Sequence, residues 1–480
     1  MAKLQIATKK ALYLLVLLFI LLPGLPLSAF PRFQKPPTDF GELERVILAE
    51  LQEKNCPGAA LAIVKGDQLI YSRGFGVANI ETQTPVTPDT LFQIGSITKT
   101  FTAVGVLGLV TDGKLKLDVP IGKYVQGLNP KLAQVTLHQL LSHTAGIIDE
   151  PDEFGSQDES LMSGYLRSWN DDYALFPRGE LFSYSNSGFA LAGFVAAEAL
   201  GTRYTGLMAE RVFQPLGMTR TTFQPTVAMT YPLAVGHQTQ DKKPVVVRPL
   251  AHDARLYPAG TFYTSAHDMA RFVTAILNGG KLDSKQVLAP SIFPQMQSPV
   301  ARLLSTTDGT SYGYGLFMNQ YRGVQQYWHE GSMTGYVAMM AVFPEQKVGY
   351  ILLCNGNGVD LSKSKEKIME VMLPLKSKLI NTPAPSQPLT QEEMNFYAGQ
   401  YFQPNRFRIE ILIKNQQLFI KELGQEMPLT KIGEHRFSFQ FPLAPQPWEI
   451  YIQPGKDGKP LAAHQYVWGF KKIAPASTNQ

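Results

Sequence analysis

The residues with the clearest chemical potential are a serine and a lysine three positions apart, Ser96 and Lys99. They lie in the stretch 91–110, where Lys99 is the single charged side chain. If this stretch is a buried helix with Gly95 and Ser96 at its start, the spacing places both side chains on one face, one turn apart. Burial disfavours an ammonium ion, so Lys99 is expected to have a lowered pKa and to accept the serine proton.

The same pair has an ordinary alternative. Ser-x-x-Lys occurs by chance in many proteins, with the serine capping a helix and the lysine extending its head group to solvent. The apolar surroundings favour catalysis instead. The start of a helix also presents unpaired N–H groups, which stabilise negative charge that develops on a substrate.

Two polar groups further along the chain could complete such a site. Tyr184 could relay a proton beside an ammonium or hold a phenolate, and Asn186 could orient a substrate amide. In His329-Glu-Gly-Ser332, Gly331 would let a substrate approach the backbone closely. The N–H of Ser332 could then join that of the nucleophile in an oxyanion hole. Alone, each group is more typical of a structural polar segment than of a catalytic one.

The strands that must position these residues are predicted at the two ends of the region 58–354. Continuous apolar runs bounded by turn residues predict buried strands there, and the block 87–275 between them reads mainly as helix and loop. The simplest architecture pairs the terminal strands in one antiparallel sheet covered by helices. The helical block is a second lobe, with the active site between the two. The predicted strands are 58–64, 69–74, 336–343 and 348–354, and the predicted helices are 42–54 and 360–372, the second capped by Asp360.

Taken together and in this order, the motifs resemble the penicillin-recognising serine hydrolases. That superfamily includes class C β-lactamases, D-alanyl-D-alanine carboxypeptidases and β-lactamase-like esterases. The likeness runs from about Gly58 to Leu375. It also includes the segments Leu140-Leu-Ser-His-Thr-Ala-Gly146, Pro258-Ala-Gly-Thr-Phe-Tyr263 with Asp268, and Tyr312-Gly-Tyr-Gly315.

The resemblance implies an exported serine hydrolase that cleaves an amide or ester, such as a D-Ala peptide, a β-lactam or a short-chain ester. Ser96 would be acylated, Lys99 and Tyr184 would share the general acid and base work, and Asn186 would bind the substrate. No metal or cofactor is expected. The alternative is a catalytically idle sensor or binding protein with the same fold, although a binding module has no need of a buried lysine.

One motif departs from the family pattern. His329-Glu-Gly331 stands where many members have Lys-Thr-Gly, whose lysine helps to recognise a substrate carboxylate. A histidine carries that charge only when it is protonated, with an ordinary pKa near ~6.5. The departure argues against an efficient β-lactamase and leaves an esterase or a peptidase open. His143 is interpreted as a packing residue.

The resemblance also bears on the two cysteines. In the family sheet the first strand lies antiparallel beside the last. Cys56 precedes the first predicted strand and Cys354 ends the last one, so the two could meet. An exported protein reaches an oxidising compartment, where such a pair can form a disulfide.

A second domain follows a linker rich in proline at 379–388. Alternating apolar and polar residues at 407–413 begin a series of short strand-like runs. Residues 389–480 are therefore predicted to form a small antiparallel β domain with a barrel-like shape. It resembles the lipocalin-like modules appended to some β-lactamase-related hydrolases. Such a module could cover the cleft, bind a ligand, mediate assembly or simply add stability.

Residues 1–29 have the pattern of a signal peptide, with basic residues, an apolar run and then helix breakers. The predicted hydrolase domain then spans 30–378, and the protein is expected in the periplasm or outside the cell. A membrane contact is expected only if this segment stays uncleaved. The formal charge of +5 includes Lys3, Lys9 and Lys10, so the rest of the chain carries +2. That near-neutral balance argues against a nucleic-acid partner and leaves a small molecule or peptide as the substrate.

Overall fold

A computed structural model describes residues 39–150, 153–378, 388–404, 406–442, 444 and 447–474. The predicted signal peptide at 1–29 and most of the predicted linker at 379–388 lie outside these ranges. Within them, no helix combines the length and the apolar character that a membrane span requires.

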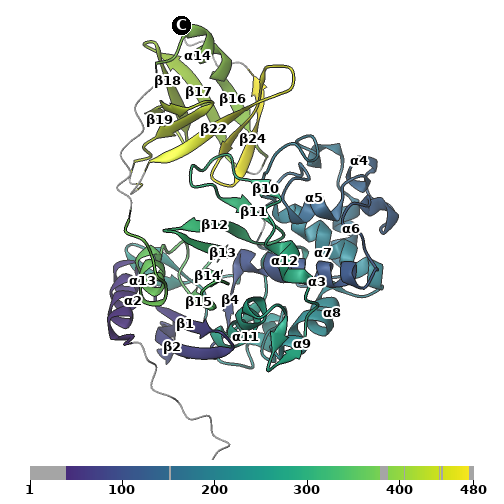
Figure 1. Ribbon diagram of the computed structural model, residues 1–480, viewed down its shortest axis with the longest axis vertical. Helices are drawn as coiled ribbons and strands as arrows, with labels where there is room; N and C mark the ends of the chain where they lie inside the picture. The colour runs from purple at the N-terminus through teal and green to yellow at the C-terminus, as the bar shows by residue number, and fades with distance from the viewer. Residues whose placement is uncertain are drawn as a thin grey trace, which may run out of the picture. The chain divides into compact units, whose positions relative to one another are not determined.

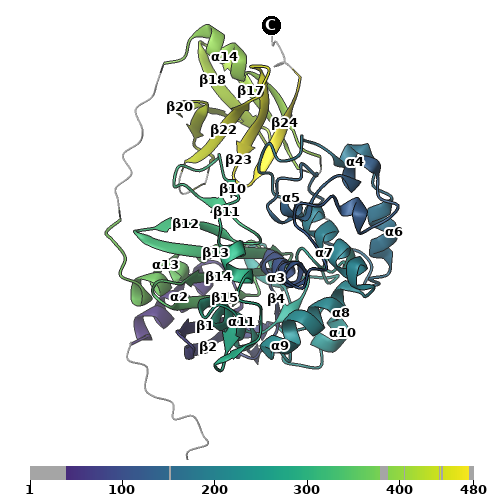
Figure 2. The same cartoon turned by 45° about the vertical axis from the view of Figure 1, so that its right-hand side comes forward.

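A nine-stranded antiparallel sheet forms the framework of the first domain, in the order β10-β11-β12-β13-β14-β15-β1-β2-β3 (Figure 2). Strand β1 (Gly58–Lys65) lies between β15 (Val348–Cys354) and β2 (Gln68–Asn79), with Ala59 opposite Cys354. Strand β14 (Tyr336–Phe343) follows on the other side of β15. The prediction that the terminal strands share one antiparallel sheet is confirmed.

Helices cover both faces of this sheet because side chains alternate along each strand. From β1, Ala60, Ala62 and Val64 enter the apolar core that includes helix α11 (Ala266–Leu277). The intervening residues of β1 enter a second core with α2 (Gly41–Glu53) and α13 (Ser362–Met372). Figure 1 shows α2 and α13 side by side, as their contacts require.

The helical lobe is built around α3 (Thr98–Thr111) and α7 (Asn186–Leu200), which pack on each other. Both are apolar on nearly all sides because other elements surround them. The other helices are α4 (Pro130–Ala133), α5 (Leu137–Leu141), α6 (Leu161–Arg167), α8 (Tyr204–Met208), α9 (Gln214–Leu216), α10 (Pro225–Ala228) and α12 (Ile292–Met296). The short strands are β3 (Thr84–Pro85), β4 (Phe92–Gln93), β5 (His237–Gln240), β6 (Lys243–Val246), β7 (Tyr263–Thr264), β8 (Lys281–Leu282) and β9 (Lys285–Gln286).

Three features described here differ from the sequence-based prediction. His329 to Ser332 lie inside a strand, β13 (Val324–Met333), rather than in a loop before one, because polar residues and Gly331 mask its strand pattern. β13 is joined by β10 (Ala301–Arg302), β11 (Ser311–Tyr312) and β12 (Phe317–Tyr321), which are too short to be recognised from an apolar run. Helix α13 starts two residues later than predicted, and the Asp360 carboxylate accepts the N–H of Ser362 at 3.0 Å.

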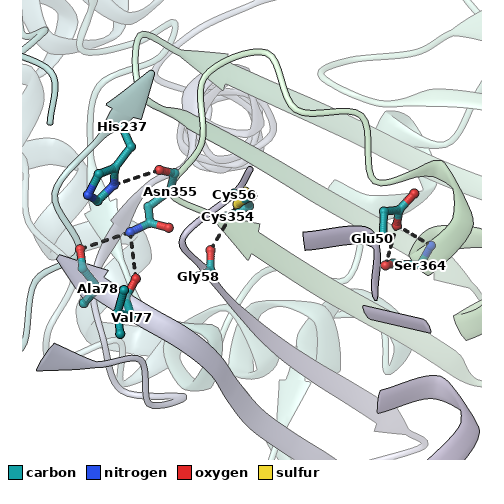
Figure 3. The surroundings of a disulfide bond; sticks show 9 residues. All are labelled: Glu50, Cys56, Gly58, Val77, Ala78, His237, Cys354, Asn355 and Ser364. Carbon is teal, nitrogen blue, oxygen red and sulfur yellow. Dashed lines mark hydrogen bonds between the residues drawn. A yellow bond between two sulfur atoms is a disulfide. The ribbon is translucent and has the colours of Figure 1, made fainter. Parts of the chain in front are cut away.

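A disulfide joins Cys56 to Cys354, 298 residues apart, where β15 ends beside the start of β1 (Figure 3). Next to it, the Asn355 side chain donates to the carbonyls of Val77 and Ala78 on β2 at 3.2 and 3.0 Å. These interactions fix the end of the β1–β15 pair, where the first and last strands of the domain meet.

Replacing both cysteines with alanine is expected to lower the free energy of unfolding by about 2–4 kcal/mol, because the cross-link restricts the unfolded chain. Urea unfolding of the oxidised protein and of the double variant would measure the difference. The sequence has two cysteines, so the unreduced, denatured wild type should show no free thiol. A titration that finds two thiols would contradict the disulfide.

The C-terminal domain is a second nine-stranded antiparallel sheet, ordered β19-β18-β17-β16-β24-β23-β22-β21-β20. Its edge strands β19 (Gln425–Pro428) and β20 (Thr430–Gly433) are adjacent in the chain, so the sheet curls into a nearly closed barrel filled by apolar side chains. This confirms the predicted barrel-like shape. The remaining elements are α14 (Gln391–Tyr397), β16 (Gly399–Phe402), β17 (Arg408–Lys414), β18 (Gln417–Glu422), β21 (Arg436–Phe439), β22 (Trp448–Pro454), β23 (Pro460–Gln465) and β24 (Trp468–Ala474).

Candidate active site

Ser96 lies on a tight turn directly before α3. Gly95 has a φ of +52°, which favours glycine, and the turn Gly95–Ile97 is a single 3₁₀ turn that leads into the helix. The Thr98 hydroxyl donates to the Gly95 carbonyl at 2.7 Å and holds the turn closed. Ser96 is half-buried, whereas its neighbours on both sides are buried. The turn therefore presents this one hydroxyl at the surface of a packed core.

Lys99 is fully buried one turn further along. Its Nζ lies 3.0 Å from Ser96 Oγ, 2.6 Å from Asn186 Oδ1 and 2.7 Å from the Ala259 carbonyl. Burial lowers the pKa of Lys99 from its usual value to about 7. A substantial fraction of the lysine is then neutral near pH 7, with a lone pair that can take the serine proton.

Tyr184 also contacts Lys99, with its ring centre 4.8 Å from Nζ. It precedes helix α7, whose N-cap Ser185 accepts the N–H of Gly188 at 2.9 Å. Burial raises the pKa of Tyr184 far above its ordinary value, although a hydrogen bond with Ser96 opposes the rise. The side chain is therefore a neutral phenol beside Ser96 and suits a proton relay rather than a resting phenolate.

The two histidines of the site carry no charge near neutral pH. Burial lowers the pKa of His329 to about 3, and its Nδ1 donates to the Glu330 carbonyl at 2.6 Å. His329 therefore cannot replace the cation of a Lys-Thr-Gly motif. Burial also lowers the pKa of His143, whose Nδ1 accepts the N–H of Ser185 at 3.0 Å and whose ring lies 4.2 Å from that of Tyr184.

The second half of β13 faces the serine turn. Strand β12 pairs with β13 only as far as Trp328, and the Gly95–Ile97 turn packs against the strand beyond that point. A Cβ atom on Gly331 would lie 1.8 Å from the Ile94 carbonyl oxygen and 2.9 Å from the Ser96 nitrogen. Only glycine permits this approach, which brings the backbones of Ser96 and Ser332 to the same side of the site.

Gly331→Ala is therefore expected to displace the serine turn and to lower kcat/KM by at least about 10²-fold, since small displacements of reacting groups are costly. Gly108→Ala in α3 is a matched control because a Cβ there meets no atom within 4 Å. The control should keep wild-type activity and gain up to about 1 kcal/mol of stability. Steady-state kinetics and thermal unfolding would compare the two, and a fully active Gly331→Ala would contradict the close approach.

A cavity of about 570 Å³ lies over Ser96. It brings together the predicted residues Ser96, Tyr184, Asn186, His329, Gly331 and Ser332. It also contains Glu330 of the predicted His329-Glu-Gly331 motif. Further lining residues were not predicted: Glu153, Phe317, Trp328 and Lys365 from the first domain, and Arg406, Tyr466, Val467 and Trp468 from the barrel. Among the residues that the structure describes, no group of three or more His, Cys, Asp or Glu is arranged to hold a metal ion.

Two further charged residues contact the site from outside the predicted motifs. Asp149 is fully buried and accepts the backbone N–H of Asn186 at 2.8 Å. Arg406, between β16 and β17, forms an ion pair with the same carboxylate across 257 residues of sequence. No spacing or motif in the sequence links the two, so the pair could be found only from the structure.

Comparisons with known proteins identify relatives of this chain. The family model described as Beta-lactamase matches residues 43–371. Protein flp of Staphylococcus aureus (strain N315) is 26% identical over 68% of this chain, and the chain spans 65% of the length of that relative. Penicillin-binding protein 4 of Amycolatopsis lactamdurans is 30% identical over 63% of this chain and 82% of its own length. The crystal structure of SurE covers 90% of this chain and 98% of its own, at 25% identity and a TM-score of 0.74.

Proposed function

Because this chain belongs to the Beta-lactamase family, we propose that it is a serine hydrolase that works through an acyl-enzyme on Ser96. The observation that carries the proposal is the 3.0 Å contact between Lys99 Nζ and Ser96 Oγ, made by a lysine whose pKa burial lowers to about 7. A structural lysine would extend its head group to solvent instead. Here the amine is buried against a hydroxyl that lines the cavity.

In the acylation step, Ser96 Oγ attacks the substrate carbonyl carbon while the neutral Lys99 amine takes the hydroxyl proton. The backbone N–H groups of Ser96 and Ser332 stabilise the negative charge on the carbonyl oxygen. When the intermediate collapses, the bond to the leaving group breaks. The Tyr184 hydroxyl donates its proton to that group and regains one from the Lys99 ammonium. Water then hydrolyses the acyl-enzyme, with the amine again acting as the base.

For the substrate we propose a short-chain ester, or a peptide that is not recognised through a free carboxylate, rather than a penicillin. The neutral state of His329 supports this choice, because the position that recognises a carboxylate in many relatives carries no charge here. Asn186, at the start of α7, lines the cavity, and its side-chain oxygen lies 2.6 Å from the Lys99 amine, which supports a role in binding a substrate amide. We also propose that residues 1–29 are a signal peptide, so that the reaction takes place in the periplasm or outside the cell.

Turnover and intact mass, measured with D-Ala peptides, cephalosporins and p-nitrophenyl esters, would test the proposal. We expect turnover of at least one class and a transient adduct that peptide mapping locates on Ser96. Denatured protein given the same reagents is the control and should carry no adduct. A stable adduct without turnover would favour a sensor, and the absence of both would favour an idle binding protein.

A further inference from the structure

The charge on Lys99 decides whether it can act as a base, and few charged groups surround it. His143 and His329 are neutral, since burial lowers the pKa of both, and Tyr184 stays protonated. In the part of the chain that the structure describes, the charges that act on the Lys99 amine are those of Asp149 and Arg406. They act in opposite directions.

Asp149 is connected to Lys99 through Asn186. One oxygen of the buried carboxylate accepts the Asn186 N–H at 2.8 Å, and the Asn186 side-chain oxygen lies 2.6 Å from Lys99 Nζ. An uncompensated carboxylate at this position would stabilise the ammonium form of Lys99 and so disable the base. A buried charge without a partner is also costly for folding.

Arg406 supplies the compensating charge. Its guanidinium pairs with the second oxygen of Asp149 and stacks on the Trp468 ring, 4.5 Å from the ring centre. The pair is well shielded from solvent, because the side chain of Asp149 is fully buried and that of Arg406 is 20% exposed. The positive charge that balances the active-site carboxylate therefore comes from the barrel.

Three hydrogen bonds to backbone atoms of the barrel hold it against the site. The Val467 carbonyl accepts the N–H of Tyr184 at 2.9 Å, and the N–H of Gly469 donates to the Ser183 hydroxyl at 3.2 Å. The Ser305 hydroxyl, between β10 and β11, donates to the Tyr466 carbonyl. These contacts fix the hairpin between β23 and β24, on which Trp468 supports Arg406.

We propose that Arg406 is a positioning residue of the hydrolase site, which neutralises Asp149 and thereby keeps Lys99 able to act as a base only when the barrel is docked. The inference rests on the proposed function. It gives the C-terminal domain a role in the chemistry, beyond stability or assembly. The first domain alone would contain the nucleophile and the lysine, but also an unpaired carboxylate that holds the lysine protonated.

The test is the pH dependence of kcat/KM for an ester substrate in the full-length protein. In the wild type, activity should rise with pH through the Lys99 pKa, near 7. Arg406→Gln should move this rise to higher pH by about one to two units, as expected for the loss of one nearby charge in a protein interior. At pH 6.5 kcat/KM should then fall about tenfold or more, while at pH 9 most of the activity should return.

Removing the partner should have the opposite effect. Asp149→Asn should move the rise to lower pH, and the double variant Asp149→Asn/Arg406→Gln should return it to within about 0.5 unit of the wild type. Arg406→Lys keeps the charge and should also stay close to the wild type. Arg408→Gln is a matched control, because Arg408 is exposed on β17 and donates to Gln400 within the barrel.

The outcomes separate this inference from the proposed function. If the wild type shows no turnover that depends on Ser96, the proposed function fails. If it turns over but Arg406→Gln lowers activity equally at every pH, or the double variant stays displaced, Arg406 has only a structural role and this inference is wrong. Should Arg406→Gln fail to fold, Asp149→Asn decides alone, since an unmoved pH profile in that variant contradicts the coupling.

Discussion

Replacing Ser96 with alanine is expected to lower kcat/KM by at least about 10⁴-fold and to abolish the covalent adduct, because the substitution removes the attacking hydroxyl. The fold should be unaffected, since Ser96 is half-buried and alanine fits the same turn. Ester hydrolysis and intact-mass analysis of wild type and variant would measure both effects.

Ser332→Ala is the matched control for this experiment. Ser332 also lines the cavity, but the contribution proposed for it comes from its backbone N–H, which alanine retains. The control is expected to keep activity within about tenfold of the wild type. A Ser96→Ala variant with more than a tenth of wild-type activity would contradict the acyl-enzyme mechanism. An inactive Ser332→Ala would show that the hydroxyl, rather than the N–H, is needed.

Replacing Lys99 with methionine is expected to cost about 10³-fold or more in kcat/KM, since methionine keeps much of the buried volume but removes the base. The loss should be accompanied by a change in pH dependence. The wild-type profile should rise towards a plateau as Lys99 loses its proton, with a midpoint near the Lys99 pKa of about 7. The residual activity of the variant should lack that rise.

Lys99 should also make the free energy of unfolding depend on pH. Its pKa is about 7 in the folded protein and near its usual value of about 10.5 in the unfolded chain. Between these two pH values the unfolded state binds the extra proton, so this group makes the protein more stable as the pH rises from 7 towards 10. Below pH 7 the destabilisation of the folded state by the buried ammonium is fully present. Urea unfolding at pH 7 and pH 9 should show a larger gain with pH for wild type than for Lys99→Met, and equal gains would contradict a buried, titrating lysine.

Much of the fold was predictable because its central strands are continuous apolar runs. Residues 336–343 and 348–354 are strands with the predicted bounds, since a strand covered on both faces needs apolar residues at every position. The strands β10 to β12 were not predicted. They are two to five residues long and carry polar side chains, so their pairing depends on neighbours far away in sequence.

The site was predictable where its geometry is local. Ser96 and Lys99 are one helical turn apart, so their contact follows from the sequence spacing alone. The ion pair of Asp149 with Arg406 is a product of how the barrel contacts the helical lobe. Neither residue lies in a motif, and a loop aspartate is usually exposed. Only a three-dimensional structure could reveal that Asp149 is completely buried.

The order of strands in the first sheet has a consequence for how the protein reaches its native state. Strand β1 lies between β2 and β15, so one of its two hydrogen-bonding edges stays open until residues 348–354 have been synthesised. Helix α2 packs against α13, which is synthesised later still. Such long-range pairing makes folding slow and leaves an apolar edge strand exposed to association with other chains in the meantime. We expect refolding yields to fall steeply as protein concentration rises, and a chain that ends before β15 to aggregate rather than form a smaller folded domain.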